Sequence, residues 1–155
     1  MRKYRYFNKL TIASIVALLF LTAFLSACQT STMSVISDKN EEGKPVINVS
    51  AQNVSDSAGN GNLTISKDEC LVISPILNKG YFQVEVRKGG MSGNTVLNEK
   101  IEGKVMNSYE LESGEYEFII TGKNGATGTM LIFAQNKAEL DAQNKALNEA
   151  LNSTK

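Results

Sequence analysis

The sequence of 155 residues contains no histidine. A cysteine nucleophile paired with histidine is therefore excluded, because no imidazole can act as the base. A Ser–His–Asp triad and a zinc or haem site with histidine ligands are excluded for the same reason. No other catalytic motif stands out, so we expect a protein that is not an enzyme and needs no cofactor or metal.

Cysteine is almost as scarce, with Cys28 and Cys70 as the two examples. Cys70 lies in "ECLVISP", an apolar run typical of a strand. Unpaired cysteine usually behaves as a small buried hydrophobe. We expect Cys70 to be buried and inert; the alternatives are an intermolecular bridge or a reactive thiol.

The N-terminal segment lacks acidic residues. It begins "MRKYRYFNK", with four basic residues, and continues with an uncharged run, Leu10 to Phe24. Small residues follow in "LSAC", which completes the three-part layout of a secretory signal. An apolar run of fifteen residues is short for a bilayer core that needs about twenty. A single N-terminal membrane anchor is the less favoured alternative.

The four residues Leu25, Ser26, Ala27 and Cys28 resemble the lipobox of bacterial lipoproteins at every position. The resemblance implies that a diacylglycerol is attached to the Cys28 sulfur and that a peptidase cleaves between Ala27 and Cys28. Residues 1–27 would then be a signal peptide, and membrane lipid would be a partner through Cys28. The implied location is the extracytoplasmic side of the cell membrane, or of an outer membrane where the cell has one.

Cleavage at this site would change the charge balance. The sequence has 16 basic and 16 acidic residues, and the removed segment carries four basic residues and no acidic one. A mature chain with a net charge of about −4 argues against a nucleic-acid partner, which requires a basic patch. It also predicts no overall electrostatic attraction to an anionic membrane. Attachment is expected from two acyl chains, which together hold a protein stably.

The remaining sequence divides into three parts. Residues 28–45 are polar and are expected to form a flexible tether. Residues 46–133 contain short runs of β-branched and aromatic residues separated by turn residues. Residues 134–155 lack glycine and proline and predict a helical tail.

The central part predicts one antiparallel β-sandwich, jelly-roll-like, with about seven or eight strands. Phe82, Val84 and Val86 alternate with polar residues, as do Tyr116, Phe118 and Ile120, so each set should face the core. Asn124-Gly125 predicts a type I′ hairpin turn. The fold class is thus mainly β, with an N-terminal signal helix and a C-terminal helix.

The stretch "GEYEFIITGKNGATGTMLIF" resembles the closing strands of jelly-roll sandwiches in GOLD-like or prepeptidase-type accessory domains. That resemblance implies a domain that binds or presents something and does not catalyse. In the tail, Leu140, Leu147 and Leu151 share one side of the expected helix. We favour a solvated or sheet-docked terminal helix over a partner-binding or self-associating one, because the repeat is too short for a coiled coil.

Two groups of polar residues are candidate sites. Glutamates occur in pairs, Glu110 with Glu112 and Glu115 with Glu117, beside an expected turn. Paired carboxylates can hydrolyse glycosides, but solvated charges at a strand end are the expected role. Oxygen donors gather at Asn53, Asp56, Asn60 and Asn62. One carboxylate is too little charge for tight calcium binding, so a plain loop is expected.

These observations leave two hypotheses about function. The favoured one is a membrane-anchored extracytoplasmic lipoprotein with a binding or structural β-sandwich, whose partner is an unknown envelope protein or glycan. The alternative is a hydrolase of envelope material that uses carboxylates such as Glu110 and Glu112. A pocket with two carboxylates about 5–10 Å apart would favour the hydrolase.

Overall fold

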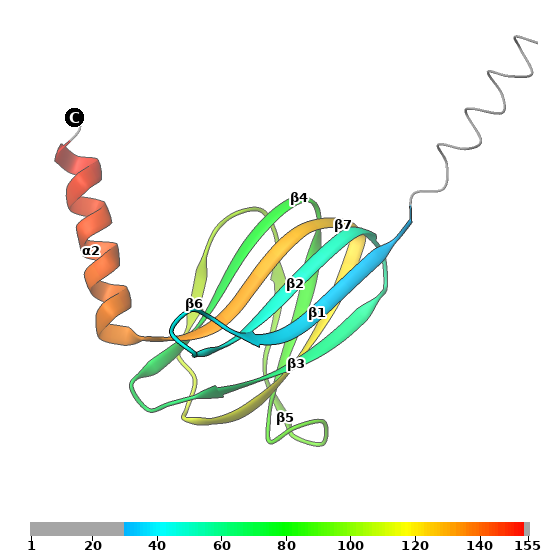
Figure 1. Cartoon of the computed structure of the whole chain (residues 1–155), viewed down its shortest axis with the longest axis horizontal. Helices are drawn as coiled ribbons and strands as arrows, with labels where there is room; N and C mark the ends of the chain where they lie inside the picture. The colour runs from blue at the N-terminus through cyan, green and yellow to red at the C-terminus, as the bar shows by residue number, and fades with distance from the viewer. Residues whose placement is uncertain (1–29, 154–155) are drawn as a thin grey trace, which may run out of the picture. The chain divides into compact units, whose positions relative to one another are not determined.

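The computed structural model describes residues 30–153 (Figure 1). The signal peptide, its expected helix and the lipobox residues Leu25 to Cys28 lie outside the described residues. The strands are β1 (Thr32–Lys39), β2 (Pro45–Val54), β3 (Ala58–Ile65), β4 (Glu69–Lys88), β5 (Asn94–Ile101), β6 (Asn107–Tyr109) and β7 (Gly114–Asn136), followed by helix α2 (Lys137–Ser153). Among these residues, no helix has the length and apolar character that a membrane span requires.

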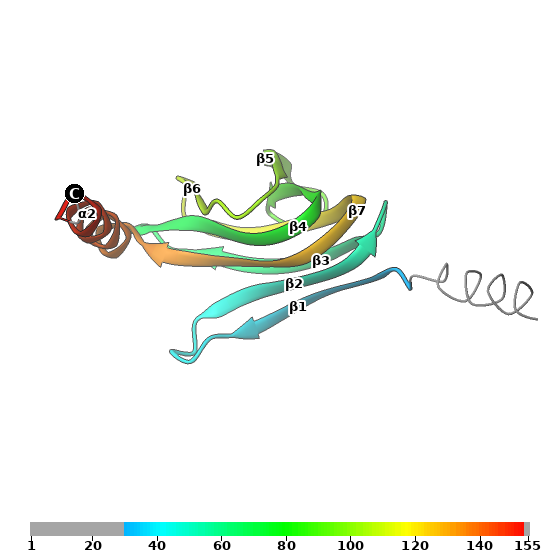
Figure 2. The ribbon, with the colours of Figure 1, turned by 90° about the horizontal axis from the view of Figure 1, so that it is seen from above.

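Two long strands, β4 and β7, form the frame of the domain. They pair with each other along almost their whole length, from Glu69↔Asn136 to Lys88↔Tyr116. All seven strands are hydrogen-bonded into one continuous sheet, whose two halves share β4 and β7 and are called the first and second sheet below. The first half of β4 and the second half of β7 belong to the first sheet, in the order β1-β2-β7-β4-β6. The other halves belong to a second sheet, in the order β3-β7-β4-β5. In Figure 2, β1 and β2 lie on one side of the long strands and β5 and β6 on the other. The prediction of an antiparallel β-sandwich with seven or eight strands is confirmed.

β4 and β7 cross from the first sheet to the second where their pairing register shifts, between Leu77 and Tyr81 of β4. Asn124 and Gly125 have positive φ angles of 56° and 69°, as a type I′ turn requires. The chain nevertheless continues as one strand, and residues 124–126 of β7 lie opposite the single residue Gly80 of β4. The predicted hairpin at Asn124-Gly125 is therefore wrong. The Asn-Gly pair does adopt the predicted positive φ angles, but in this strand they produce a bulge that bends β7.

The core lies between the sheets and contains both predicted apolar sets. Phe82, Val84, Val86, Phe118 and Ile120 are fully buried. On β3, Gly59 and Gly61 let β1 and β2 approach closely. A Cβ atom on Gly59 would lie 2.5 Å from Val35, and one on Gly61 would lie 3.0 Å from Ile47.

The predicted tether at residues 28–45 is wrong from Thr32 onward. Thr32–Lys39 forms β1, which pairs with β2 from Thr32↔Gln52 to Lys39↔Pro45. Met33 and Val35 are half-buried against the core, and this contact orders a segment whose other residues are polar or charged except for the exposed Ile36. The β region also extends past residue 133 to Asn136, so it spans 32–136 and not 46–133.

The C-terminal helix docks through its first turns. Asn136 caps its start, because the Asn136 Oδ1 accepts the backbone N–H of Ala138 at 3.0 Å. Leu140 is buried against Cys70, Val72 and Phe133. A sheet-docked start of the tail is therefore confirmed, whereas the side chains of Leu147 and Leu151 lie outside the described residues.

Candidate binding face on the second sheet

The outer face of the second sheet carries rows of mostly polar side chains from four neighbouring strands. Residues paired across strands share a face, so the register defines each row. One row joins Asn62 of β3, Glu117 of β7 and Arg87 of β4. The next row, which also reaches β5, consists of Asn60, Ile119, Glu85 and Asn98.

Glu85 and Arg87 are fixed by a hydrogen-bonded network. The Glu85 Oε1 accepts from the Arg87 Nε at 2.8 Å and from the Thr95 Oγ1 at 2.7 Å. A second guanidinium nitrogen of Arg87 donates to the Met91 carbonyl at 2.9 Å. These bonds, with Arg87 as the main cause and Thr95 second, hold the pKa of Glu85 below its ordinary value of 4.5.

Glu117 is the unusual member of this face. Its exposed fraction is 4%, and its Oε2 atom is buried without a hydrogen-bond partner. Its cross-strand neighbour Arg87 points its guanidinium at Glu85 and Met91 instead. Buried carboxyl groups are rarely left unpartnered, because desolvation is costly. The expectation that Glu117 is a solvated charge is therefore wrong: it lies within a strand, covered by its neighbours, and not at a frayed strand end.

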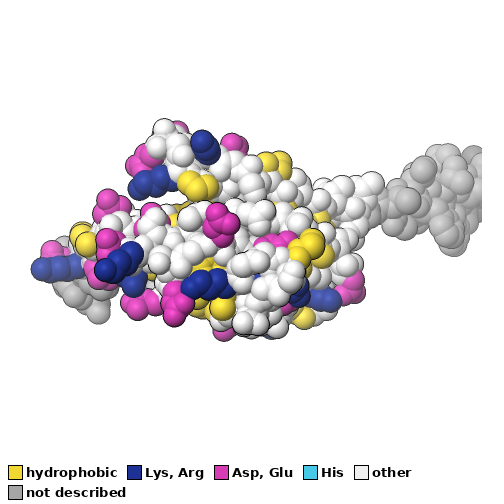
Figure 3. All heavy atoms as spheres, turned by 90° about the horizontal axis from the view of Figure 1, so that it is seen from below, with side chains coloured by type: hydrophobic (Ala, Val, Ile, Leu, Met, Phe, Trp, Pro, Cys, Tyr) yellow, Lys and Arg dark blue, Asp and Glu magenta, His cyan; other side chains and the backbone are white. Residues whose placement is uncertain are grey.

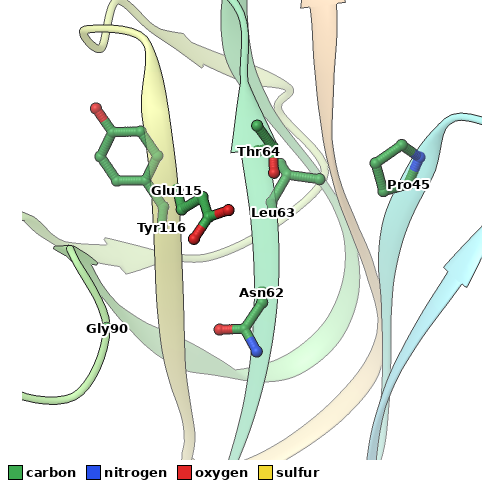
Figure 4. A pocket seen from close by; sticks show the side chains of 7 residues that line it. All are labelled: Pro45, Asn62, Leu63, Thr64, Gly90, Glu115 and Tyr116. Atoms are coloured by element: carbon green, nitrogen blue, oxygen red, sulfur yellow. The ribbon is translucent and has the colours of Figure 1, made fainter.

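A depression of about 400 Å³ lies beside this row. Its lining residues are Pro45, Asn62, Leu63, Thr64, Gly90, Glu115 and Tyr116. In Figure 4, Asn62 and Thr64 come from β3, the Glu115 carboxylate points from β7 toward β3, and the Tyr116 ring points away from them. The Tyr116 hydroxyl donates to the Glu112 carbonyl at 2.5 Å, so this ring supports the turn.

Glu110 and Glu112 do not line this depression and do not act as a pair. The Glu112 carboxylate binds the Lys88 ammonium at 2.6 Å, whereas Glu110 lies 3.6 Å from the Lys137 ammonium. Both side chains are more than four-fifths exposed. Of the four glutamates singled out in the sequence, Glu115 alone contributes to the depression. This arrangement gives no support to carboxylate-dependent hydrolysis.

The other oxygen-rich group is dispersed. Asp56 forms an ion pair with Lys123, while Asn60 and Asn62 lie on β3. In residues 30–153, no group of three or more His, Cys, Asp or Glu side chains is placed to hold a metal. Figure 3 shows a face on which acidic and basic side chains are mixed and hydrophobic side chains occur in small groups.

Cys70 is 97% buried, as predicted, and is not paired with another cysteine. Its thiol lies 3.5 Å from the Gln135 carbonyl, to which it donates. Burial raises the pKa of the Cys70 thiol, and the nearby Lys137 opposes this only in part. A protonated, buried thiol is a poor nucleophile.

The fold defines the chain as an antiparallel β-sandwich protein. No protein-family model and no curated protein matches its sequence. Among solved structures, it is similar to the PliG periplasmic lysozyme inhibitor of g-type lysozyme from Aeromonas hydrophila, with 10% identity, 63% of this chain and 93% of that chain covered, and a TM-score of 0.45.

Two further solved structures are also similar. A family 35 carbohydrate-binding module from an environmental isolate has 10% identity, covers 68% of this chain and 85% of its own, and has a TM-score of 0.41. The pre-peptidase C-terminal domain of a Bacillus anthracis collagenase has 10% identity, covers 68% and 89%, and has a TM-score of 0.39. At such low identity, no site residue is transferred from these proteins to this chain.

Proposed function

We propose that this chain is a lipid-anchored extracytoplasmic lipoprotein whose β-sandwich binds an envelope protein or glycan without catalysing a reaction. The anchor is supported by the basic and apolar N-terminal segments and by the lipobox match at residues 25–28. The binding role is supported by the outer face of the second sheet.

One observation carries the binding role, namely the buried carboxylate of Glu117 with its unpartnered oxygen. Such a group costs stability, and natural proteins keep costly polar groups mainly where they function. Asn62 lies directly across from it on β3, and Glu115 lies two residues away on β7. The exposed oxygens of Asn62 and Glu115 favour a ligand that presents hydrogen-bond donors, such as hydroxyl, amide or ammonium groups. A ligand that displaces the side chains covering Glu117 would also give its buried oxygen a donor.

The test is crosslinking in living cells. A photoreactive residue replaces Asn62 in one variant and exposed Glu42, in the β1–β2 turn, in a control variant. We expect a specific adduct from position 62 that is absent from position 42. Protease treatment of the adduct then identifies a protein partner, and glycan-cleaving enzymes identify a glycan.

A matched pair of substitutions tests the role of Glu117. Glu117→Gln keeps the shape but removes the charge, and we expect it to reduce the position-62 adduct. Glu112→Gln makes the same chemical change on an exposed side chain outside the face, and the adduct should remain. If both variants crosslink like the parent, or if position 42 captures the same molecule, this face is not the binding site.

A further inference from the structure

The start of β1 places one end of the sandwich close to the proposed lipid anchor. Thr32 is the first residue of β1, and four residue steps separate it from Cys28. Four extended residues span at most about 14 Å. A lipid on Cys28 therefore confines the start of β1 to the membrane surface, whereas a flexible tether over residues 28–45 would have let the domain move freely.

The structure shows which residues share that end. Thr32 pairs with Gln52, and the backbone N–H of the following Asn53 donates to the Thr127 hydroxyl at 3.0 Å. Thr127 in turn pairs with Lys79 of β4. The neighbouring Leu77 N–H donates to the Gly103 carbonyl at 2.9 Å, which brings the β5–β6 loop to the same end.

Charge is divided between the two ends of the sandwich. The charged residues at the end near Thr32 are Lys79, Lys100, Lys104, Lys123, Asp56 and Glu102, an excess of two positive charges. At the opposite end, segments 38–44, 66–69 and 110–115 carry eight acidic and three basic residues. Including Lys88 and the first turns of α2 leaves that acidic excess unchanged. The net negative charge of the mature chain thus lies away from the anchor.

Exposed apolar side chains adjoin the basic end. Val105 and Met106, which follow Lys104 in the β5–β6 loop, are 69% and 47% exposed. Ile76, next to Leu77 in β4, is 55% exposed. Apolar side chains beside lysine are the combination that an interface of anionic head groups and acyl chains accepts.

We propose that the end of the sandwich formed by the β5–β6 loop and the β4–β7 bulge docks on the anionic phospholipid surface to which Cys28 is anchored. Lys79 and Lys104 contact lipid phosphates, and Val105 and Met106 enter the head-group region. At physiological salt, such charges act over about 8 Å, so they attract the surface once the connection, which spans at most about 14 Å, has brought this end of the sandwich close to it. The acidic end and the start of α2 then point away from the membrane. This inference rests on the proposed lipid anchor.

Tryptophan fluorescence provides the test, because the sequence contains no tryptophan. The mature lipidated protein, purified from cells as V105W, is placed in vesicles of phosphatidylethanolamine and phosphatidylglycerol that contain a head-group nitroxide lipid. A matched variant, K67W, carries the probe in the exposed turn at the acidic end. We expect quenching of V105W to exceed that of K67W several-fold, with blue-shifted emission from V105W alone.

Two further comparisons test the role of charge. In the V105W background, K79E with K104E should lower the quenching, and so should vesicles of phosphatidylcholine alone. M106W provides a second probe on the same loop if V105W folds poorly. Equal quenching of V105W and K67W would overturn the docking model. If M106W replaces V105W, equal quenching of M106W and K67W would overturn it in the same way. Metabolic labelling with a fatty-acid analogue measures lipidation independently of docking. A protein that is lipidated but shows equal quenching of the probes at its two ends therefore refutes the docking and not the anchor.

Discussion

Glu117 and Phe118 are consecutive residues of β7 that point to opposite faces of the second sheet, and their substitutions should have opposite effects on stability. Glu117→Met keeps the length of the side chain but removes the buried oxygen that has no partner. An unsatisfied buried polar group costs about 1–3 kcal/mol, so this substitution should stabilise the fold by about that amount. Phe118→Ala leaves a cavity in the core and should cost about 3–5 kcal/mol.

Urea unfolding of the full mature chain, followed by circular dichroism, measures both effects. With a slope of about 1–3 kcal/mol per molar urea, Glu117→Met should raise the midpoint by about 1 M. Phe118→Ala should lower it by more, since about 5–15 kcal/mol is the whole stability of a typical domain. A fall in the midpoint of Glu117→Met would show that the Glu117 carboxyl group is stabilised by other groups of the folded domain, and would refute the reasoning that it costs stability and is kept for binding.

Three further outcomes are expected. A thiol reagent should label Cys70 only after denaturation; rapid labelling of the native protein would contradict its burial. Gly80→Ala should destabilise more than Gly43→Ala in urea unfolding, because both glycines have positive φ but only at Gly80 would a Cβ meet backbone atoms; equal losses would argue against the tight bulge. The lowered pKa of Glu85 means that its stabilisation is present above pH 4.5 and is lost as pH falls through the folded-state pKa. The stability difference between the parent and Glu85→Gln should therefore shrink on acidification below about pH 4.5, and a difference constant with pH would exclude the Arg87 contact as its cause.

The parts of the fold that the sequence predicted are those where local pattern and burial agree. The alternation at Phe82, Val84 and Val86 is buried as expected, because these side chains face the core from a central strand. At Asn124-Gly125 the local pattern predicts a hairpin, whereas the structure has a bulge. Positive φ angles at these residues are a local property, whereas the continuation of β7 depends on its pairing with β4.

The sequence pattern did not predict β1 or the burial of Glu117, for a related reason. In β1 only Met33 and Val35 pack against the core. Of the other six positions, five are polar or charged and the sixth, Ile36, is 56% exposed, so the segment looks like a linker until β2 and β3 are in place. Glutamate is almost never buried unless it is paired, so no sequence pattern predicted an exposed fraction of 4%. Its burial arises from neighbouring strands that are distant in sequence.

The central claim of an anchored binding domain is tested most directly at Cys28. Mass spectrometry of the protein isolated from bacterial membranes should find an N-terminal Cys28 carrying diacylglycerol, with residues 1–27 removed. The Cys28→Ser variant should remain as the uncut precursor and should incorporate no fatty-acid analogue. An N-terminus elsewhere in the chain, or equal fatty-acid labelling of the Cys28→Ser variant and the parent, would contradict the account.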